Sequence, residues 1–214
     1  MTAPDLDFTV EGAEPLRFAV SPHIVFKLRA RNNSSLAIHT VILRCQIQID
    51  ASRRRYSTDE QRRLTDLFGQ PSQWAETLRG LLWTNTSTVL PAFQTDLAAD
   101  LQVPCTFDFN IAATKYFEGL QAGDVPISFY FNGTIFYSAD SGALQVAQIS
   151  WEKEASYSMP VSVWKQMMEM HYPNVAWLCL QRDAFDRLYE FKVRNGIPTF
   201  EEAVFQTLEG EMKA

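Results

Sequence analysis

The chain has few of the residues that build covalent cross-links or metal centres. Its 214 residues include three cysteines and three histidines. Cys45, Cys105 and Cys179 are odd in number and far apart, which argues against a disulfide framework and a structural zinc site. Each lies in an apolar run, where a free thiol behaves as a small hydrophobic side chain. We therefore expect reduced thiols and, with them, a cytoplasmic location.

Long hydrophobic runs are also missing. No apolar stretch approaches the ~18 residues that a membrane-spanning helix needs. The first residues, including Asp5 and Asp7, contain neither the basic nor the apolar region of a secretory signal. We expect a protein with no membrane span that stays in the cytoplasm. Its 46% hydrophobic and 21% charged residues are ordinary for a globular protein, and 214 residues can bury a sizeable core.

Recognisable catalytic motifs are absent from the sequence. It contains no G-x-S-x-G, P-loop, G-x-G-x-x-G or H-E-x-x-H pattern. His23, His39 and His171 each lack a second ligand at metal-binding spacing, so each is better explained as a surface or boundary residue. The balance favours a non-catalytic protein with no metal and no cofactor.

What the sequence does contain is a long run of alternating residues near its N-terminus. Apolar positions alternate with polar ones from Ile24 to Arg31 and again from Leu36 to Ile49, around one polar turn. A two-residue period predicts strands with one buried and one wet face. We predict an opening hairpin, with a β-bulge near His39 and Thr40, where the inward parity changes.

The outward positions of these two strands are basic, although the net charge of the chain is −6. A solvated strand face is the default interpretation. The alternative is a docking site for an acidic protein partner, where such charge sets association rate and specificity. A second basic segment follows at residues 53–55, and arginine binds phosphates and carboxylates bidentately. The candidate partner-binding residues are therefore Lys27, Arg29, Arg31, Arg44, Arg53, Arg54 and Arg55.

The charge is also unevenly distributed along the chain. Residues 1–80 hold eleven Lys and Arg against nine Asp and Glu, whereas residues 81–214 hold eight against sixteen. A dedicated nucleic-acid-binding protein is normally basic overall or carries a dense basic patch. The densest basic cluster, residues 53–55 with Arg62 and Arg63, is diluted by neighbouring acids. Nucleic acid is therefore the weakest of the partner hypotheses.

The remaining pattern predicts more strands, a helical insertion and helices at the C-terminus. Ser57 and Glu60 form a capping box that opens the first of two short helices near 57–79. After Pro160 the spacing becomes helical, with a short strand at 175–180 and a helix stop at Gly196. The other strands are predicted at 8–20, 82–90, 103–111, 125–137, 144–151 and 155–159, with a turn at Asp140-Ser141-Gly142.

These elements predict an α+β fold that is mainly β. Its body is an antiparallel β-sandwich-like domain over residues 8–159, with a two-helix insertion near 57–79. C-terminal helices in residues 160–210 form a region that packs on this body.

Several segments also resemble a known family. They occur in this order: Leu43-Arg44-Cys45-Gln46-Ile47, Arg53-Arg54-Arg55-Tyr56-Ser57, Asp66-Leu67-Phe68-Gly69, Leu82-Trp83-Thr84, Val103–Phe109, Ala113–Phe117, Trp151–Ala155 and Tyr172-Pro173-Asn174. From about Phe8 to Leu208 the chain resembles DUF6084, a family of bacterial proteins of unknown function. The resemblance implies a genomic neighbourhood, because members are often encoded beside nickel–iron hydrogenase genes. It implies no catalytic residues.

The first functional hypothesis is a non-catalytic accessory protein that acts by protein–protein contact in nickel–iron hydrogenase assembly or regulation. A hydrogenase subunit itself is excluded, because the chain lacks paired C-x-x-C motifs and has too few cysteines for iron–sulfur clusters. The alternative is an enzyme or small-ligand-binding protein with a site assembled from scattered residues. A pocket gathering two or more of them would favour that alternative. Its candidates are His39, Asp108, Lys115, Tyr116 and Arg44.

Overall fold

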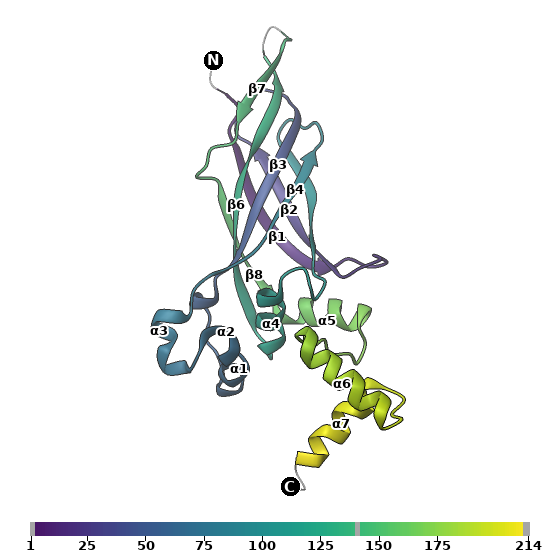
Figure 1. Cartoon of the computed structure of the whole chain (residues 1–214). Coiled ribbons are helices and arrows are strands. Elements are labelled where there is room, and N and C mark those ends of the chain that lie inside the picture. The colour runs from purple at the N-terminus through teal and green to yellow at the C-terminus, as the bar shows by residue number, and fades with distance from the viewer. Residues whose placement is uncertain (1–2, 140–141, 212–214) are drawn as a thin grey trace. The chain divides into compact units, whose positions relative to one another are not determined.

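The computed structural model describes residues 3–139 and 142–211. The chain divides into two compact units, Met1–Asn174 and Val175–Ala214 (Figure 1). The fold is α+β and mainly β, as predicted, with antiparallel strands and several helices. No helix in the described part of the chain is both long and apolar enough to cross a bilayer.

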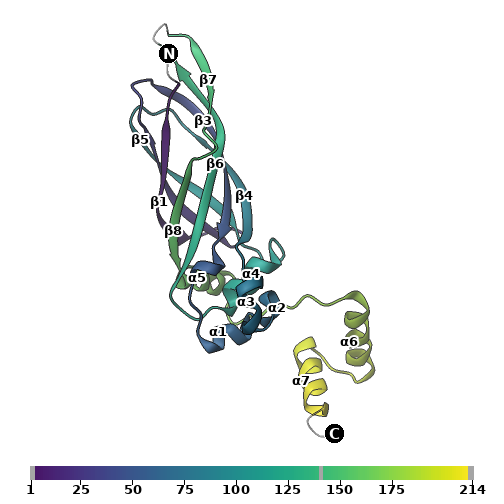
Figure 2. The same cartoon turned by 90° about the vertical axis from the view of Figure 1, so that its left-hand side faces the viewer.

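The first unit is built on two antiparallel sheets, whose strands run side by side in Figure 2. Sheet A has the order β1 (Leu6–Pro15), β2 (His23–Asn32), β5 (Asp96–Pro104). Sheet B has the order β4 (Leu81–Leu90), β3 (Ile38–Ile49), β6 (Asp124–Ser138), β7 (Leu144–Gln148), and β8 (Glu154–Pro160) also pairs with β6.

The core lies between the inner faces of these two sheets. In β3, for example, buried and exposed residues alternate along most of the strand, as the two-residue period predicts. Aromatic rings join the sheets: Phe8 stacks on Phe131 at 4.6 Å, and Phe26 meets Phe129 edge-on at 5.0 Å. This packing confirms the β-sandwich-like body.

The predicted opening hairpin was wrong. β2 pairs with β1 and β5, whereas β3 pairs with β4 and β6, so the link between them crosses from one sheet to the other. The buried amide of Asn32 holds this crossing, since its Nδ2 donates to the carbonyl oxygens of Leu36 and Gln94 at 2.8 Å each. Alternation showed which face of each strand is buried but not which strand lies beside it. The predicted bulge is confirmed by a register shift between Ile38 and Thr40.

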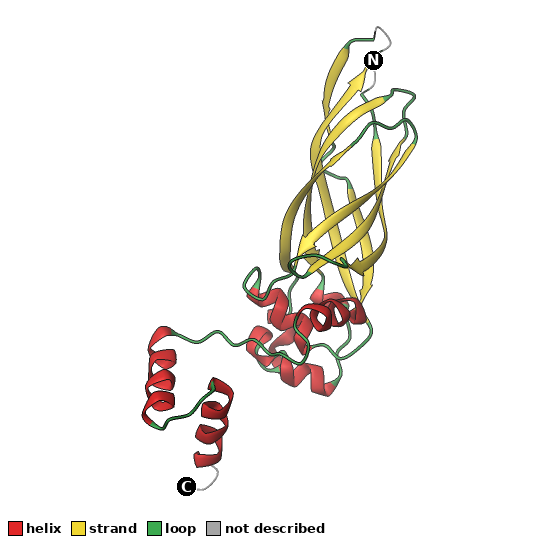
Figure 3. Ribbon diagram, turned by 90° about the vertical axis from the view of Figure 1, so that its right-hand side faces the viewer, coloured by secondary structure: helices red, strands yellow, loops and turns green. Residues whose placement is uncertain are grey.

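Five helices of the first unit gather at one end of the sandwich (Figure 3). Ser57 and Glu60 form the predicted capping box. Three packed aromatic rings join this end to the sheets. The centroid of the Phe117 ring lies 5.0 Å from that of Trp83 and 4.5 Å from that of Trp164. The helices are α1 (Thr58–Arg63), α2 (Thr65–Phe68), α3 (Trp74–Thr77), α4 (Ile111–Gly119) and α5 (Val161–His171).

Two predicted strands are absent from the described structure. β5 ends at Pro104, and the alternating residues that follow form a turn and then α4 instead of a strand over 103–111. Asn110 begins that helix, because its Oδ1 accepts a hydrogen bond from the amide of Ala113 at 3.0 Å. Residues 175–180 have no regular secondary structure. The predicted turn at Asp140-Ser141-Gly142 includes residues outside the described part.

The second unit contains α6 (Arg182–Arg194) and α7 (Phe200–Glu211). Gly196 stops α6 as predicted, since its φ is +63° and the next amide, of Ile197, donates to the Lys192 carbonyl at 3.0 Å. α5 groups with the first unit by its contacts. The expectation that residues 160–210 pack on the sandwich as one helical region stays a prediction.

The thiols differ sharply in their expected reactivity. Burial raises the pKa of Cys45 to about 12 and also raises the pKa of Cys105, whereas Cys179 is exposed. Because the thiolate is the reactive form, we expect Ellman's reagent to modify Cys179 alone in the native protein at pH 8. All three thiols should react after unfolding in guanidinium. Reaction of Cys45 or Cys105 in the native state would contradict this placement.

Candidate functional site

Four of the predicted partner-binding residues lie on β2 and β3, but they do not share one face. Lys27, Arg29 and Arg31 lie on β2 and point outward from sheet A, whereas Arg44 lies on β3 and points outward from sheet B. The outer faces of the two sheets are on opposite sides of the sandwich. The structure therefore separates Arg44 from the other three.

Two of the three cations of sheet A, Lys27 and Arg29, pair with acids on neighbouring strands, and the third, Arg31, lies in register with Asp7 and Asp96. Lys27 Nζ lies 2.9 Å from Glu14 and 3.0 Å from Asp100, and these hydrogen bonds raise its pKa. Arg29 forms a bidentate pair with Glu11, which raises the pKa of the arginine in the same way. Such exposed pairs contribute little to stability. They leave the outer face of sheet A without a concentrated positive charge.

Arg54 has a structural role within the first unit. Its side chain is 8% exposed and forms a bidentate ion pair with Glu60, with contacts of 2.8 Å and 3.2 Å. Burial alone would raise the pKa of Glu60, but hydrogen bonds from Arg54 and from the amides of Gln121 and Ser57 lower it to about 2. The network ties α1 to the segment between α4 and β6.

The other arginines of the basic cluster, residues 53–55 with Arg62 and Arg63, are more exposed. Arg53 lies 3.4 Å from Asp50, and Arg62 pairs with Asp59 at 2.7 Å. Arg55 is exposed and makes no ion pair or hydrogen bond within residues 3–139 and 142–211. The prediction that Arg53, Arg54 and Arg55 contact a partner stays a prediction.

Unlike Lys27 and Arg29, Arg44 is not paired with an acidic residue in the described part of the chain. It makes no ion pair or hydrogen bond with any residue that the structure describes. It lies in register with Ser87 of β4 and Asn132 of β6, so hydroxyl and amide groups flank it on both sides. The depression around it has a volume of about 370 Å³ and is lined by Arg44, Cys45, Gln46, Asn85, Thr86, Ser87 and Asn132.

An apolar band runs beside this depression on the same outer face. Ile42 and Val89 are cross-strand partners and are 42% and 64% exposed. Phe136, which is half-buried, pairs with Val146, which is 57% exposed. Cross-strand and diagonal neighbours on one face of a sheet lie within contact distance, so the four side chains form a continuous band.

We call the outward side chains of this region the sheet B surface. It combines the apolar band with one unpaired arginine and a row of amide and hydroxyl groups, a composition typical of protein interfaces. The sequence singled out only Arg44. The sequence also contained a sign of the apolar part of this surface, because Ile42 and Val89 are apolar residues at positions where the alternation of their strands points outward. The sheet B surface comprises Ile42, Arg44, Gln46, Asn85, Ser87, Val89, Asn132, Phe136 and Val146.

The candidates for a scattered catalytic site are not brought together around Arg44. The depression there is lined by none of His39, Asp108, Lys115 and Tyr116. Lys115 Nζ instead lies 3.7 Å from Asp66, and the buried Tyr116 hydroxyl lies 2.8 Å from that of Tyr56. Within the described residues, no three His, Cys, Asp or Glu side chains are placed to hold a metal ion.

Comparisons with known proteins add a family but no activity. A model described as "Family of unknown function (DUF6084)" matches residues 3–214. No curated protein matches. A crystal structure of selenomethionine-labelled β-glucosidase from Kluyveromyces marxianus aligns at 8% identity with a TM-score of 0.26, over 74% of this chain. The chain spans only 15% of that β-glucosidase. A likeness this low says nothing about function.

Proposed function

We propose that this chain, which belongs to the DUF6084 family of unknown function, acts by binding another protein through the sheet B surface. The observation that supports this proposal is the contrast between its two outer faces. Sheet A pairs Lys27 and Arg29 with acids and sets Arg31 between Asp7 and Asp96. Arg44 of sheet B lies between Ser87 and Asn132 instead, beside exposed apolar side chains.

The proposal includes the chemistry of the partner. An unpaired arginine flanked by hydroxyl and amide groups favours a carboxylate on the opposing surface, because arginine recognises carboxylates bidentately. The band beside it favours an apolar patch, which would be covered when the proteins meet. We therefore propose a partner with an acidic group next to exposed hydrophobic residues.

We also propose that this partner belongs to nickel–iron hydrogenase assembly or regulation. The support is the genomic neighbourhood that the family resemblance implies. In this role the protein is an accessory factor and supplies no catalytic residue.

Charge reversal at Arg44 tests the proposed surface. We expect Arg44→Glu to weaken partner binding at least tenfold, since it places a carboxylate against a carboxylate and leaves the scaffold unchanged. The matched control is Arg17→Glu, which makes the same change at an exposed, unpaired position in the β1–β2 loop. The measurement is quantitative co-purification of hydrogenase assembly proteins with tagged chains from a hydrogenase-expressing host.

A second pair of variants probes the apolar band. Val89→Asp should also reduce co-purification, whereas Thr9→Asp, on the outer face of sheet A, should not. Equal recovery with Arg44→Glu and wild type would remove the sheet B surface from the proposal. Thermal unfolding of each variant shows whether a loss reflects binding or folding.

A further inference from the structure

The C-terminal unit exposes much more apolar surface than it buries. Among its described residues, the buried hydrophobic side chains are Ile197, at 5% exposure, and Ala203, at 0%. The exposed large hydrophobic residues of the unit are Val175, Trp177, Leu178, Leu180, Phe185, Tyr189, Val193, Val204, Phe205 and Leu208. So many exposed apolar side chains in one small unit indicate a surface that another molecule covers.

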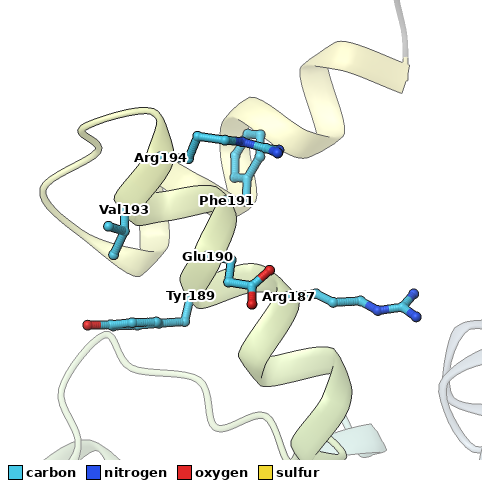
Figure 4. Close-up of a pocket in the computed structure, with 6 residues that line it drawn as sticks. All are labelled: Arg187, Tyr189, Glu190, Phe191, Val193 and Arg194. Carbon is cyan, nitrogen blue, oxygen red and sulfur yellow. The ribbon is translucent and has the colours of Figure 1, made fainter.

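The two helices do cover each other in part. The rings of Phe185 and Phe200 lie 5.4 Å apart, and Lys192 Nζ lies 5.5 Å above the Phe200 ring. A shallow depression along α6 is drawn in Figure 4, where Tyr189 and Val193 project away from Arg187. This limited packing orders α6 against α7 but leaves Tyr189, Val193, Phe205 and Leu208 exposed.

The apolar positions of α7 form a stripe at helical spacing. On α7 the stripe contains Phe200, Ala203, Val204 and Leu208, at intervals of three and four residues. Between the helices and residues 176–180 lies an apolar groove of about 410 Å³. Its lining residues are Ala176, Leu178, Leu180, Phe185, Leu188, Phe200, Glu201, Val204 and Phe205. Two helices cannot bury all of these apolar side chains, whereas four helices can bury them as the core of a bundle.

We infer that a second copy of this chain covers the stripe, so that two C-terminal units form a four-helix bundle. The unit spans Val175–Ala214, a length at which chains generally need oligomerisation or another cross-link to fold. Its only thiol, Cys179, is free. A second copy of the chain is always made together with the first. It is therefore available to bury the apolar side chains of the C-terminal unit as soon as that unit folds.

The charges of the two helices specify how the copies pair. The sequence of α7 contains no Lys or Arg and carries Glu201, Glu202, Glu209 and Glu211. α6 carries Asp183, Asp186 and Glu190, but its four Lys and Arg outnumber them and its last turn holds Lys192 and Arg194. Packing α7 of one copy against α6 of the other sets acid beside base, and two-fold symmetry repeats each such contact. Packing α7 against α7 would set acid beside acid. The inference concerns the C-terminal unit alone and stands independently of the sheet B surface.

The oligomeric state of the full chain tests this inference. Sedimentation velocity should give twice the 24.4 kDa of one chain for wild type. Val204→Glu should give a single chain, because it places a carboxylate in the bundle core. Its matched control, Gln206→Glu, adds the same charge off the stripe and should leave the mass doubled. A wild-type protein that stays monomeric across a wide concentration range overturns the inference, as does a Val204→Glu protein that stays dimeric.

A second experiment excludes simple unfolding of the helices. One variant carries Lys192→Glu with Arg194→Glu, and the other carries Glu201→Lys with Glu202→Lys. Each should dimerise at least tenfold more weakly than wild type, because like charges then face each other between copies. Mixing the two variants should restore a dimer containing one chain of each. Absence of that mixed dimer would contradict the pairing of α6 with α7 between copies.

Discussion

Replacing Glu60 with Gln is expected to lower the free energy of unfolding by about 3 kcal/mol at neutral pH. Gln keeps the capping box, because it is also accepted at this position of a helix. What it removes is the carboxylate that faces Arg54, whose guanidinium then stays buried without a counter-charge. The ion pair joins α1 to the end of the sandwich, so we expect the whole first unit to lose stability.

The same substitution should remove part of the pH dependence of the free energy of unfolding. The pKa of Glu60 is lowered in the folded protein, from 4.5 to about 2. A carboxyl whose pKa is lowered by folding stabilises the folded state above its unfolded pKa, and this contribution is lost as the pH falls through the folded value. The difference between wild type and Glu60→Gln should therefore be full at pH 7 and shrink between about pH 4.5 and pH 2.

Urea unfolding at several pH values measures both effects. Asp59→Asn is the matched control, since it neutralises a side chain that is 57% exposed in its pair with Arg62. We expect the control to change stability by less than about 0.5 kcal/mol. Equal losses in the two variants would mean that Glu60 and Arg54 are not a buried pair.

Gly133→Ala is the second substitution with a large expected effect. Gly133 lies on β6 opposite Leu43, and its φ is +145°. A Cβ there would lie 2.1 Å from the carbonyl oxygen of Ile42 and 3.2 Å from the Cα of Leu43. Both neighbours are backbone, so β3 and β6 would have to separate beneath the sheet B surface. We expect a loss of about 2–4 kcal/mol, from the clash together with the strained backbone.

Gly142→Ala is the control for backbone strain at a positive φ without a steric clash. Gly142 has a φ of +79°, but nothing lies within 4 Å of the position that its Cβ would occupy. We expect this control to cost about 1 kcal/mol. Chemical denaturation of both variants gives the comparison. A Gly133→Ala protein as stable as Gly142→Ala would mean that β3 and β6 do not approach as closely as described.

The sequence was most informative where a repeating pattern could be read directly. The alternation in β3 and the capping box at Ser57 and Glu60 predicted local structure correctly, because each depends on neighbours within a few residues. The same alternation could not show that β2 and β3 belong to different sheets. A strand's period reports its buried face, whereas its neighbours are set by residues far along the chain.

The missed helix α4 has a similar cause. Its first residue, Ile111, continues the alternation that begins in β5, so the sequence reads as one long strand. The structure breaks that strand at Pro104, and Asn110 caps the helix that follows. The hydrogen bond from the Ala113 amide to the Asn110 side chain starts a helix here, although the apolar residues alternate as in a strand.

The candidate site was predicted only in part. Arg44 was identified as outward and basic, but so were Lys27 and Arg29, which the structure neutralises. Their acidic partners come from β1 and β5, and no local pattern places Glu11 or Asp100 beside them. The apolar band could not be assembled from the sequence either, since it depends on the order of β4, β3, β6 and β7.

Site-specific photo-crosslinking tests the central claim most directly. A photoreactive phenylalanine analogue at Val89 reports on the sheet B surface, and the same analogue at Ala98 reports on the outer face of sheet A. In cells of a hydrogenase-expressing host, we predict a discrete adduct with a second protein from Val89, none from Ala98, and loss of the adduct when Arg44→Glu is added. Adducts of equal yield from both positions, or none from Val89, would contradict a partner-binding role for the sheet B surface.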